Sequence, residues 1–339
     1  MRTADFDYEL PADRIAQFPV EPRDSAKLLL DLGSSGIEHR RVRDLDLILR
    51  EGDLLIVNDT KVLPARLPLA RGSGGRVEVL LLEPSQGDQS SRQWTAMVRP
   101  GGRLKAGEQL NDPDGRPVVE FLGRSSSSDI FEVRFVGEES PASTMERFGE
   151  MPLPPYITER RADQDRYQTV YARRAASSAA PTAGLHFTPE LIGRIESRGI
   201  GVATVELVVG LDTFKPVTVE DPADHRMHSE WYSVEQSVLD RAAEARRVVA
   251  IGTTAVRTLE SAATTGRLTG RTDLFIRRGY EWKVVDLMLT NFHLPKTTLL
   301  MMIDAFVGDR WRNIYASALE TDYRFLSFGD AMLLDRHAS

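Results

Sequence analysis

The pattern of apolar residues changes twice along this chain, and these changes limit the folds that it can adopt. Towards both ends, short apolar runs alternate with segments of helical spacing, as in Lys27 to Leu32, Val42 to Arg50 and Leu54 to Val57. Between Val62 and Val136, short apolar or alternating runs follow one another, separated by glycine-, serine- and aspartate-rich turns. Closely spaced strands of this kind are typical of a small barrel or sandwich.

The sequence therefore predicts an α/β fold in two parts. A main α/β domain with a central mixed sheet is expected over residues 1–61 and 151–339, and an inserted small all-β barrel domain over residues 62–150. The prolines of Met151 to Tyr156 favour an extended segment that returns the chain to the first domain. A chain of 339 residues, 41% of them hydrophobic, is long enough for a sizeable core.

Composition narrows the chemistry. The chain contains no cysteine, which excludes disulfides, thiolate nucleophiles and zinc–thiolate sites and leaves carboxylates, histidines and hydroxyls. The formal net charge of −7 argues against a protein that is basic overall and binds nucleic acid indiscriminately, although it allows local basic patches. No run approaches the length of a membrane span, and acids stand where a signal peptide needs a basic start, so we expect a cytoplasmic protein.

The loop at residues 181–188, PTAGLHFT, places a hydroxyl, a glycine and an imidazole directly before a helix. Thr188 suits the N-cap and Pro189 the first helical position, so a helix is expected to run to Gly199. Gly184 permits a positive φ or the close approach of a ligand, and His186 can exchange protons near neutral pH. The alternative, about equally supported by these residues alone, is a turn glycine and a satisfied core histidine.

Three further polar segments follow predicted strands, at residues 58–61 (NDTK), 252–254 (GTT) and 291–296 (NFHLPK). In open α/β sheets, ligands bind beyond the carboxyl ends of the strands. At 252–254 a helix follows, whose first amides would make an anion site, and Arg257 could add a contact or pair with Glu260 at the surface. An ordinary Asx turn is the alternative for the first segment. Together with the 181–188 loop, these segments predict a shared cleft.

Two other groups of polar residues have either a chemical or a structural role. Glu206 lies in an apolar strand, Val202 to Val209, so it must either meet a cation or reach a site. His225, His228 and Glu230 cluster in a later loop, but without a helical HExxH context we expect no metal there. Ser233 and Gln236 predict a capping box for the next helix, which is expected to end near residue 247.

Arginines and tyrosines are interleaved over residues 156–174, a mixture suited to phosphate contacts and base stacking. Nearby acids offset part of this charge, so a solvated helix with internal ion pairs is the preferred interpretation of these residues alone.

Longer motifs carry a resemblance to a known family. PTAGLHFT, MHSEWY, GTTAVRTLES and TNFHLPKTTLL, with IAQFPVEPRD, NDTKVLPARL, MPLPPY and RYQTVYAR, follow one another through essentially the whole chain. In these motifs the chain resembles the S-adenosylmethionine:tRNA ribosyltransferase-isomerase family of queuosine biosynthesis. It departs from the family pattern at Asp212, where glycine is expected, and at Ala255, where serine is more usual.

The resemblance implies a reaction. The family transfers and isomerises the ribosyl group of S-adenosylmethionine onto 7-aminomethyl-7-deazaguanine at the wobble position of tRNA, which gives epoxyqueuosine and releases adenine and methionine. S-adenosylmethionine is thus a consumed co-substrate, tRNA the partner, and a cytoplasmic monomer without metal, membrane or permanently bound cofactor is expected. The chemistry needs a base for a C5′ proton, an acid for the leaving adenine and an anion site for the methionine carboxylate.

Roles are assigned on this basis as hypotheses. His186 is the first choice for proton transfer and Glu206 for pairing with the sulfonium or an amine; with His293 they form the predicted catalytic set. The predicted substrate-binding residues are Asn58, Asp59, Thr60, Arg66, Thr182, Gly184, His228, Glu230, Thr253, Thr254, Arg257, Asn291 and Lys296. The predicted tRNA-binding residues are Arg160, Arg161, Tyr167, Arg173 and Arg174.

Two alternatives come from other functional classes. A methyltransferase would release S-adenosylhomocysteine, but the chain has no glycine-rich loop after an early strand. A non-catalytic RNA-binding protein would consume no S-adenosylmethionine and is expected to be more basic.

Overall fold

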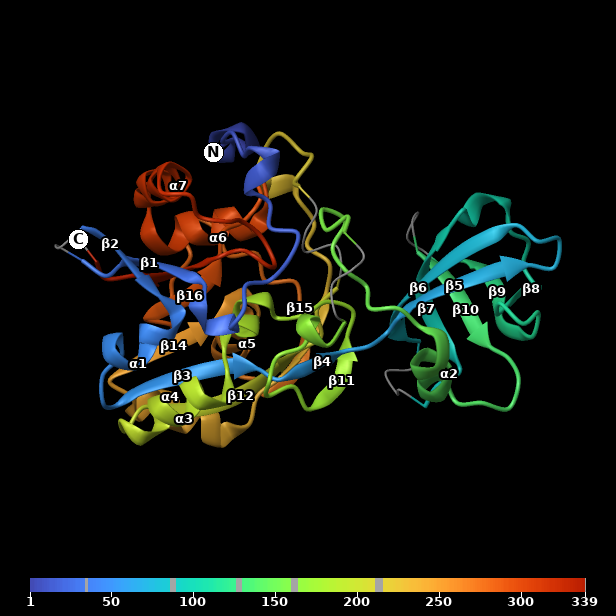
Figure 1. The fold of residues 1–339 in the computed structure, drawn as a ribbon, viewed down its shortest axis with the longest axis horizontal. Helices are drawn as coiled ribbons and strands as arrows, with labels where there is room; N and C mark the ends of the chain where they lie inside the picture. Colours follow the sequence, from blue (N-terminus) through green and yellow to red (C-terminus); the bar gives the residue numbers. More distant parts are fainter. Residues whose placement is uncertain (34–35, 86–89, 126–129, 160–163, 211–215, 339) are drawn as a thin grey trace. The chain divides into compact units, whose positions relative to one another are not determined.

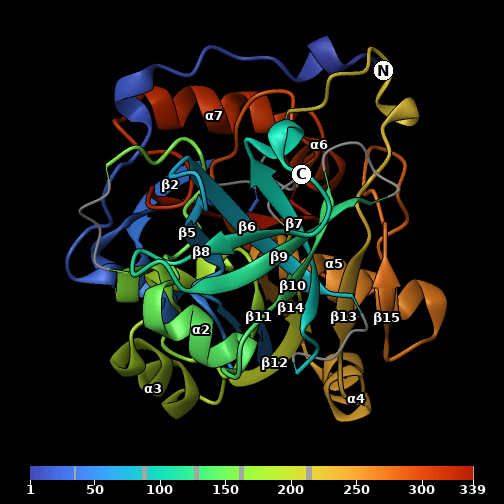
Figure 2. The same cartoon turned by 90° about the vertical axis from the view of Figure 1, so that its right-hand side faces the viewer.

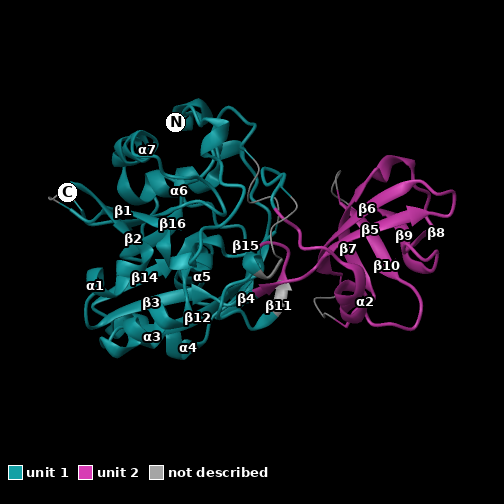
Figure 3. Cartoon of the chain, in the orientation of Figure 1, with its two compact units in different colours: residues 1–60, 154–174, 180–339 teal, residues 61–153, 175–179 magenta. Residues whose placement is uncertain are grey.

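The computed structural model describes residues 1–33, 36–85, 90–125, 130–159, 164–210 and 216–338. The chain divides into two compact units (Figure 3). The first comprises residues 1–60, 154–174 and 180–339, and the second residues 61–153 and 175–179. The fold class predicted from the sequence, an α/β sheet with an inserted β-barrel, is confirmed. Residues 175–179 group with the barrel although they lie outside the predicted range.

A mixed sheet forms the centre of the first unit (Figure 1). β12, β3, β14 and β16 are neighbours and run parallel to one another, so their carboxyl ends share one edge. β17 is antiparallel to β16 and parallel to β1. The strands of this sheet, in spatial order, are β15 (Thr269–Thr272), β13 (Glu230–Ser233), β12 (Gly201–Leu207), β3 (Asp53–Asn58), β14 (Arg247–Ile251), β16 (Leu287–Asn291), β17 (Ala331–Asp335), β1 (Lys27–Asp31) and β2 (Ile37–Arg41).

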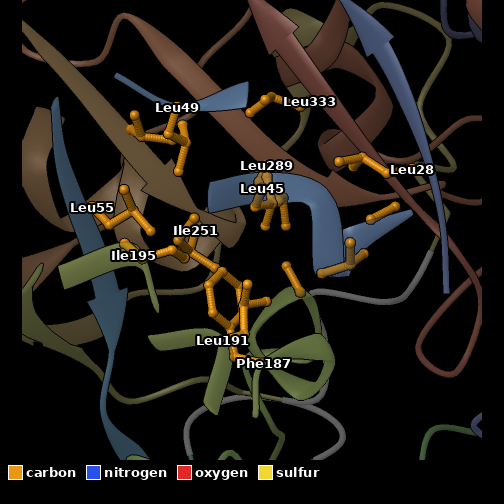
Figure 4. Packing of buried hydrophobic residues seen from close by; sticks show 14 of the residues in the cluster. Leu28, Leu45, Leu49, Leu55, Phe187, Leu191, Ile195, Ile251, Leu289 and Leu333 are labelled. Atoms are coloured by element: carbon orange, nitrogen blue, oxygen red, sulfur yellow. The ribbon is translucent and has the colours of Figure 1, made fainter. Parts of the chain in front are cut away.

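Both faces of the sheet are buried. On one face, Leu55, Ile251 and Leu289 pack against Phe187 and helix α3 (Figure 4). Leu54 and Ile56, which alternate with Leu55 along β3, are buried on the opposite face. The helices of this unit are α1 (Leu45–Ile48), α3 (Pro189–Ser197), α4 (Gln236–Glu244), α5 (Gly252–Thr265), α6 (Thr298–Val307) and α7 (Arg310–Glu320). Its 3-10 segments are Thr3–Phe6, Ala12–Arg14, Arg23–Ser25, Val42–Asp44, Gln164–Tyr167, Thr182–His186 and Pro222–Asp224.

Local capping signals had mixed outcomes. The Oγ1 of Thr188 accepts the amide of Leu191 at 3.1 Å, so the predicted N-cap is confirmed, although α3 ends at Ser197 and not at Gly199. The predicted Ser233–Gln236 capping box is wrong, because Ser233 belongs to β13 and α4 begins after Glu235. Residues 283–285 do not belong to β16, which begins at Leu287, because their amides donate to the carboxylate of Glu260.

The second unit is a closed barrel (Figure 2). Its interior is filled by alternating residues such as Val79, Leu81, Trp94 and Val133, all buried. Ser140 caps α2 (Pro141–Phe148), and Gly101–Arg103 is a 3-10 turn. The barrel strands, in spatial order, are β10 (Phe131–Phe135), β7 (Gln93–Arg99), β6 (Arg76–Pro84), β5 (Arg66–Arg71), β8 (Glu108–Asn111) and β9 (Pro117–Arg124); β4 (Thr60–Val62) and β11 (Arg174–Ser177) form a separate two-stranded sheet.

Membrane-spanning helices are not found among the described residues.

Candidate active site

A pocket lies at the carboxyl ends of β14 and β16, within the first unit. It joins three segments that the sequence singled out: the 181–188 loop, the start of α5 and the segment after β16. The lining residues are Tyr156, Ala180, Pro181, Thr182, Ala183, Val209, Gly252, Thr253, Thr254, Thr290, Asn291, Phe292, His293, Leu294, Thr297, Leu299, Leu326 and Ser327. The predicted cleft therefore exists, but the segment after β3 is not among its walls.

The start of α5 gives this pocket an anion-binding character. Gly252 has a φ of +86°, which lets the chain turn sharply from β14 into the helix. Thr253 and Thr254 follow in the first turn and line the pocket, each with only 8% of its surface exposed. Among the described residues, the Oγ1 of Thr254 has no hydrogen-bond partner. The first-turn amides and this hydroxyl suit a carboxylate or phosphate.

The segment after β16 adds neutral polar groups. The Oγ1 of Thr182 donates to the Oδ1 of Asn291 at 2.8 Å, which ties the 181–188 loop to the strand end. The Nε2 of His293 lies 3.1 Å from the Oγ1 of Thr290. Burial lowers the pKa of His293 to about 3, so its ring is neutral at physiological pH. It is suited to hydrogen bonding with an uncharged group.

His186 lies outside this pocket. Its Nδ1 is 3.1 Å from the carbonyl oxygen of Ala183, and its Nε2 is 2.9 Å from that of Gly329. The ring is buried, and burial lowers its pKa. A neutral imidazole has one N–H, so the ring donates to one of these two carbonyls, and both hold it in the interior. His186 thus links the 181–188 loop to the turn before β17, and its transfer of a proton to substrate stays a prediction.

Gly184 has a packing role. Its φ is not positive, but a Cβ at this position would lie 2.0 Å from the hydroxyl oxygen of Tyr171 and 3.0 Å from a methyl carbon of Thr169. The close approach that a glycine allows is thus made by Tyr171, so the predicted contact between Gly184 and a ligand is replaced by an internal one.

The segment after β3 lies at the same edge of the sheet but forms a different environment. The side chain of Asn58 is fully buried, donates to the carbonyl of Leu207 at 3.0 Å, and accepts the amides of Leu207 and Thr60. The Oγ1 of Thr60 also donates to Leu207. These bonds join β3 to β12, so Asn58 and Thr60 have structural roles and their predicted substrate contacts are not supported.

A carboxylate pair stands beside this junction. Burial, and next the neighbouring carboxylate of Glu206, raise the pKa of Asp59, whose Oδ1 has no hydrogen-bond partner among the described residues. Glu206 is half-buried and binds Arg174 at 2.7 Å, and the Arg174 guanidinium lies 5.0 Å from the ring centroid of Trp231. A predicted catalytic residue and a predicted tRNA-binding residue are thus partners. The cluster can hold a cation or exchange a proton.

Arg257 and Glu230 form a buried ion pair, with 3% and 5% of their side chains exposed. The other oxygen of Glu230 accepts the amide of Gly210 at 2.9 Å. Burial lowers the pKa of Arg257 to about 10, which leaves it charged at neutral pH. The suggested surface pair of Arg257 with Glu260 is wrong, and neither Arg257 nor Glu230 lines the pocket. They hold β13, α5 and the chain after β12 together.

The remaining predicted residues lie apart from the pocket. Arg66 belongs to the barrel, where it binds Glu78 at 3.2 Å. Lys296 binds Asp7 at 2.6 Å at the surface, and His228 is not among the lining residues. Tyr167 is fully buried against Phe328, so the prediction that it stacks on an RNA base is wrong.

The remaining predictions concern Arg173, Arg160, Arg161 and Asp212. Arg173 is exposed, and its amide donates to the carbonyl of Asp59 at 2.8 Å. Arg160, Arg161 and Asp212 lie outside the described residues.

Several pocket residues were missed. Tyr156 donates or accepts a 2.6 Å hydrogen bond with Ser327, and both line the pocket. Leu326, beside Ser327, has a φ of +69°, an uncommon conformation for a non-glycine residue. Nothing in the local sequence marks this turn, because it joins segments that are far apart in the chain. Among the described residues, we find no group of histidines and carboxylates that could hold a metal ion.

Comparisons with known proteins cover nearly the whole chain. A family model described as queuosine biosynthesis protein matches residues 3–334. The S-adenosylmethionine:tRNA ribosyltransferase-isomerase of Moorella thermoacetica is 48% identical over 346 residues, which cover 98% of this chain and all of that protein. The enzyme of the same name from Rubrobacter xylanophilus is also 48% identical, with 98% of each chain covered. A crystal structure of S-adenosylmethionine tRNA ribosyltransferase from Thermotoga maritima is 35% identical, with a TM-score of 0.55, and the match covers 97% of this chain and 99% of that one.

Proposed function

Because the chain belongs to the family of queuosine biosynthesis proteins, we propose that it is an S-adenosylmethionine:tRNA ribosyltransferase-isomerase. The observation that carries the proposal is similarity at 48% identity over nearly the full length of relatives with this name. The reaction moves the ribosyl group of S-adenosylmethionine onto 7-aminomethyl-7-deazaguanine in tRNA, isomerises it, and releases adenine and methionine. The earlier resemblance of the motifs to this family agrees with the comparisons.

The pocket at β14 and β16 suits S-adenosylmethionine. Ala183, Val209, Phe292 and Leu299 give it apolar walls for the adenine and the methionine chain. The first turn of α5, with the unpartnered hydroxyl of Thr254, offers hydrogen bonds to the methionine carboxylate. In this assignment, the neutral groups of Asn291 and His293 contact the adenine or the ribose.

The carboxylate pair supplies the proton chemistry in this proposal. The sulfonium acidifies the C5′ protons of the ribosyl group, and a carboxylate base removes one of them. Glu206 is assigned as this base. The raised pKa of Asp59 suits it to carry a proton for the departing adenine. The exposed guanidinium of Arg174 would leave Glu206 when the cationic substrate or the RNA backbone arrives.

The decisive experiment incubates the pure protein with S-adenosylmethionine and a tRNA that carries 7-aminomethyl-7-deazaguanine. Release of both adenine and methionine, dependent on that tRNA, is the expected result. Appearance of S-adenosylhomocysteine would instead move the chain to the methyltransferases. No product from a folded protein, checked by circular dichroism, would favour a non-catalytic RNA-binding protein.

Three finer expectations belong to the same proposal: a cytoplasmic location, a monomeric state and no permanently bound cofactor. Light scattering coupled to gel filtration tests the monomer. The third expectation is tested by extensive dialysis against a chelator and by mass spectrometry of the purified protein: full activity with only S-adenosylmethionine and tRNA added, and no bound small molecule, support it.

A further inference from the structure

The strand register of the barrel shows which charged residues lie at each of its two ends. β5 and β6 are antiparallel and joined by the turn at residues 72–75, and Glu78 of β6 stands opposite Arg99 of β7. The end of β9 is paired with the start of β10. The 72–75 turn, the segment after Arg99 and the end of β9 therefore lie at one end of the barrel. The chain enters and leaves at the opposite end, where Arg66 is paired with Glu150.

Basic residues gather at the end with the 72–75 turn. At this end the carboxylate of Glu108 is bound by Arg71 at 2.6 Å. Glu78, which lies further into the barrel along β6, is bound by Arg66 from the opposite end of β5. The other cations of this end, all exposed, are Arg76, Arg99, Arg103, Lys105 and Arg124. Among the described residues, Arg76, Arg99 and Arg103 make no ion pair. Among the described residues, this end therefore carries exposed positive charge, at Arg76, Arg99 and Arg103, that no carboxylate pairs with.

The opposite end of the barrel is acidic. Two of its arginines are engaged locally: Arg92 donates to the carbonyls of Phe135 and Gly137, and Arg147 binds Asp112 and Glu139. A third, Arg116, is exposed. The carboxylates around them are Asp112, Asp114, Glu138, Glu139, Glu146 and Glu150. A net charge of −7 for the chain thus conceals a barrel whose ends have opposite sign.

The basic end also has a backbone that a large polyanion can approach. Gly102 and Gly74 have open space around their Cα atoms. Gly101 packs directly on the ring of Phe131, where a Cβ would lie 2.5 Å from a ring carbon, and the Arg124 guanidinium lies 5.4 Å from the centroid of the same ring. The aromatic ring therefore fixes the loop of Arg103 beside Arg124 and holds the cations in one patch.

We propose that this basic end, defined by Arg76, Arg99, Arg103, Lys105 and Arg124, binds the phosphate backbone of the RNA substrate; the identity of the RNA as tRNA rests on the proposed function. Spaced arginines on a surface without deep pockets suit phosphates and carry no base specificity. Stable binding to an anionic membrane takes a second, apolar signal beside the charges. The large hydrophobic residues exposed on the described chain are Met1, Phe18, Leu47 and Val170, and none belongs to the barrel.

The test compares two triple charge reversals in the full chain. One is Arg76→Glu, Arg99→Glu, Arg103→Glu. The control is Arg50→Glu, Arg198→Glu, Arg246→Glu, which makes the same change of net charge at exposed positions before the starts of β3, β12 and β14, at the edge opposite the pocket. Fluorescence anisotropy with a labelled, unmodified tRNA transcript, without S-adenosylmethionine, gives Kd over a series of salt concentrations.

The barrel triple is expected to raise Kd about tenfold or more near 0.1 M salt, and to lower the slope of log K against log salt by about two to three units. The control should change Kd by no more than about threefold. Equal losses in the two triples, or no loss in the barrel triple, would overturn the proposal. Binding of vesicles rich in phosphatidylserine that only the barrel triple loses, with tRNA binding intact, would assign this end to a membrane instead.

Product release separates this inference from the proposed function. In the barrel triple, adenine release should show a raised KM for tRNA with an unchanged kcat, because the patch is proposed to bind the RNA backbone and not to take part in the reaction. If the wild-type chain releases no adenine but the barrel triple still loses tRNA binding, the proposed reaction fails and the RNA surface stands. If release is normal in both and Kd is unchanged, the RNA surface alone fails.

Discussion

At the carboxyl end of β16 the chain turns through residues 292–297 into α6, whereas at the carboxyl end of β3 only Asp59 separates the strand from β4. The first connection leaves room for a pocket lined by His293. The second places Asn58 between β3 and β12, where its side-chain amide makes hydrogen bonds with the backbone of Leu207. Both ends lie on one edge of the sheet. The connection that follows a strand therefore decides whether its polar end can meet a ligand.

The two ends also differ in charge. His293 is buried among neutral groups, and burial alone lowers its pKa to about 3. Asp59 lies beside the carboxylate of Glu206, which adds to the effect of burial and raises the pKa of Asp59. One edge of the sheet thus offers a neutral recognition pocket and a separate acidic cluster. A reaction that must bind a nucleoside and also move protons can use both.

Removal of the proposed base should have the largest effect. Glu206→Gln keeps the size and hydrogen-bonding capacity of the side chain but cannot accept a proton, so turnover should fall by roughly 10²–10⁴-fold. The matched control is Arg174→Gln, which frees the same carboxylate and should keep turnover within about tenfold of wild type. Initial rates of adenine release at saturating substrates give both values. Near-normal turnover of Glu206→Gln would show that Glu206 is not the base that removes the C5′ proton.

The structural role of the β3 end predicts a loss of stability without a specific loss of binding. Asn58→Ala removes the bonds to Leu207 and Thr60 inside the sheet, and should lower the free energy of unfolding by about 3 kcal/mol. Its KM for S-adenosylmethionine should stay near that of wild type. Asn291→Ala, at the β16 end, should instead raise this KM. Urea unfolding and steady-state kinetics of both variants distinguish the two ends, and a reversed pattern would contradict the comparison.

A pH dependence sharpens the contrast between the buried groups. The pKa of His293 falls on folding from 6.5 to about 3, so its neutral form is favoured in the native state. The stability that this contributes is fully present above pH 6.5 and is lost as pH falls towards 3, since the unfolded chain binds the proton first. Between pH 7 and pH 5 the loss should be about 2 kcal/mol.

His293→Gln removes this titration while keeping a polar side chain. The difference in unfolding free energy between wild type and His293→Gln, measured in urea at pH 7 and pH 5, isolates the contribution of the imidazole from that of other groups. A difference that stays constant between the two pH values would show that His293 is not buried as a neutral ring.

The sequence predicted those features whose causes are local. The change from helical to alternating spacing near residue 62 marks the barrel, and Thr188 caps α3 through its own neighbour Leu191. The partners of the charged residues were not predictable, because they come from distant segments. Glu230 and Arg257 are 27 positions apart, and Arg174 and Glu206 are 32 apart. Each pair occupies groups that, taken one at a time, resembled free ligands for a substrate.

Contacts with distant segments also account for the positions of Gly184 and His186 in the 181–188 loop. Gly184 and His186 have the residue types that a site needs, yet the loop packs them against Tyr171 and Gly329. Thr182 and Ala183, one turn earlier, face the pocket. A 3-10 segment turns successive side chains to different sides, so one short motif supplies both the wall of a site and its support.

The smallest predicted effect concerns Thr254, whose buried hydroxyl has no partner among the described residues. Thr254→Val preserves the shape of the side chain, so stability should stay the same or rise slightly, because no protein hydrogen bond is lost. If the hydroxyl binds the methionine carboxylate, KM for S-adenosylmethionine should rise about tenfold, since a hydrogen bond to a charged group is worth about 1.5 kcal/mol or more.

The control on the same helix is Thr258→Val. The Thr258 hydroxyl donates to the carbonyl of Thr254 at 3.1 Å, so its loss should act on stability and leave KM unchanged. Equal KM values for the two variants would place the anion elsewhere than at the start of α5, and the pocket would then recognise its ligand through the β16 end alone.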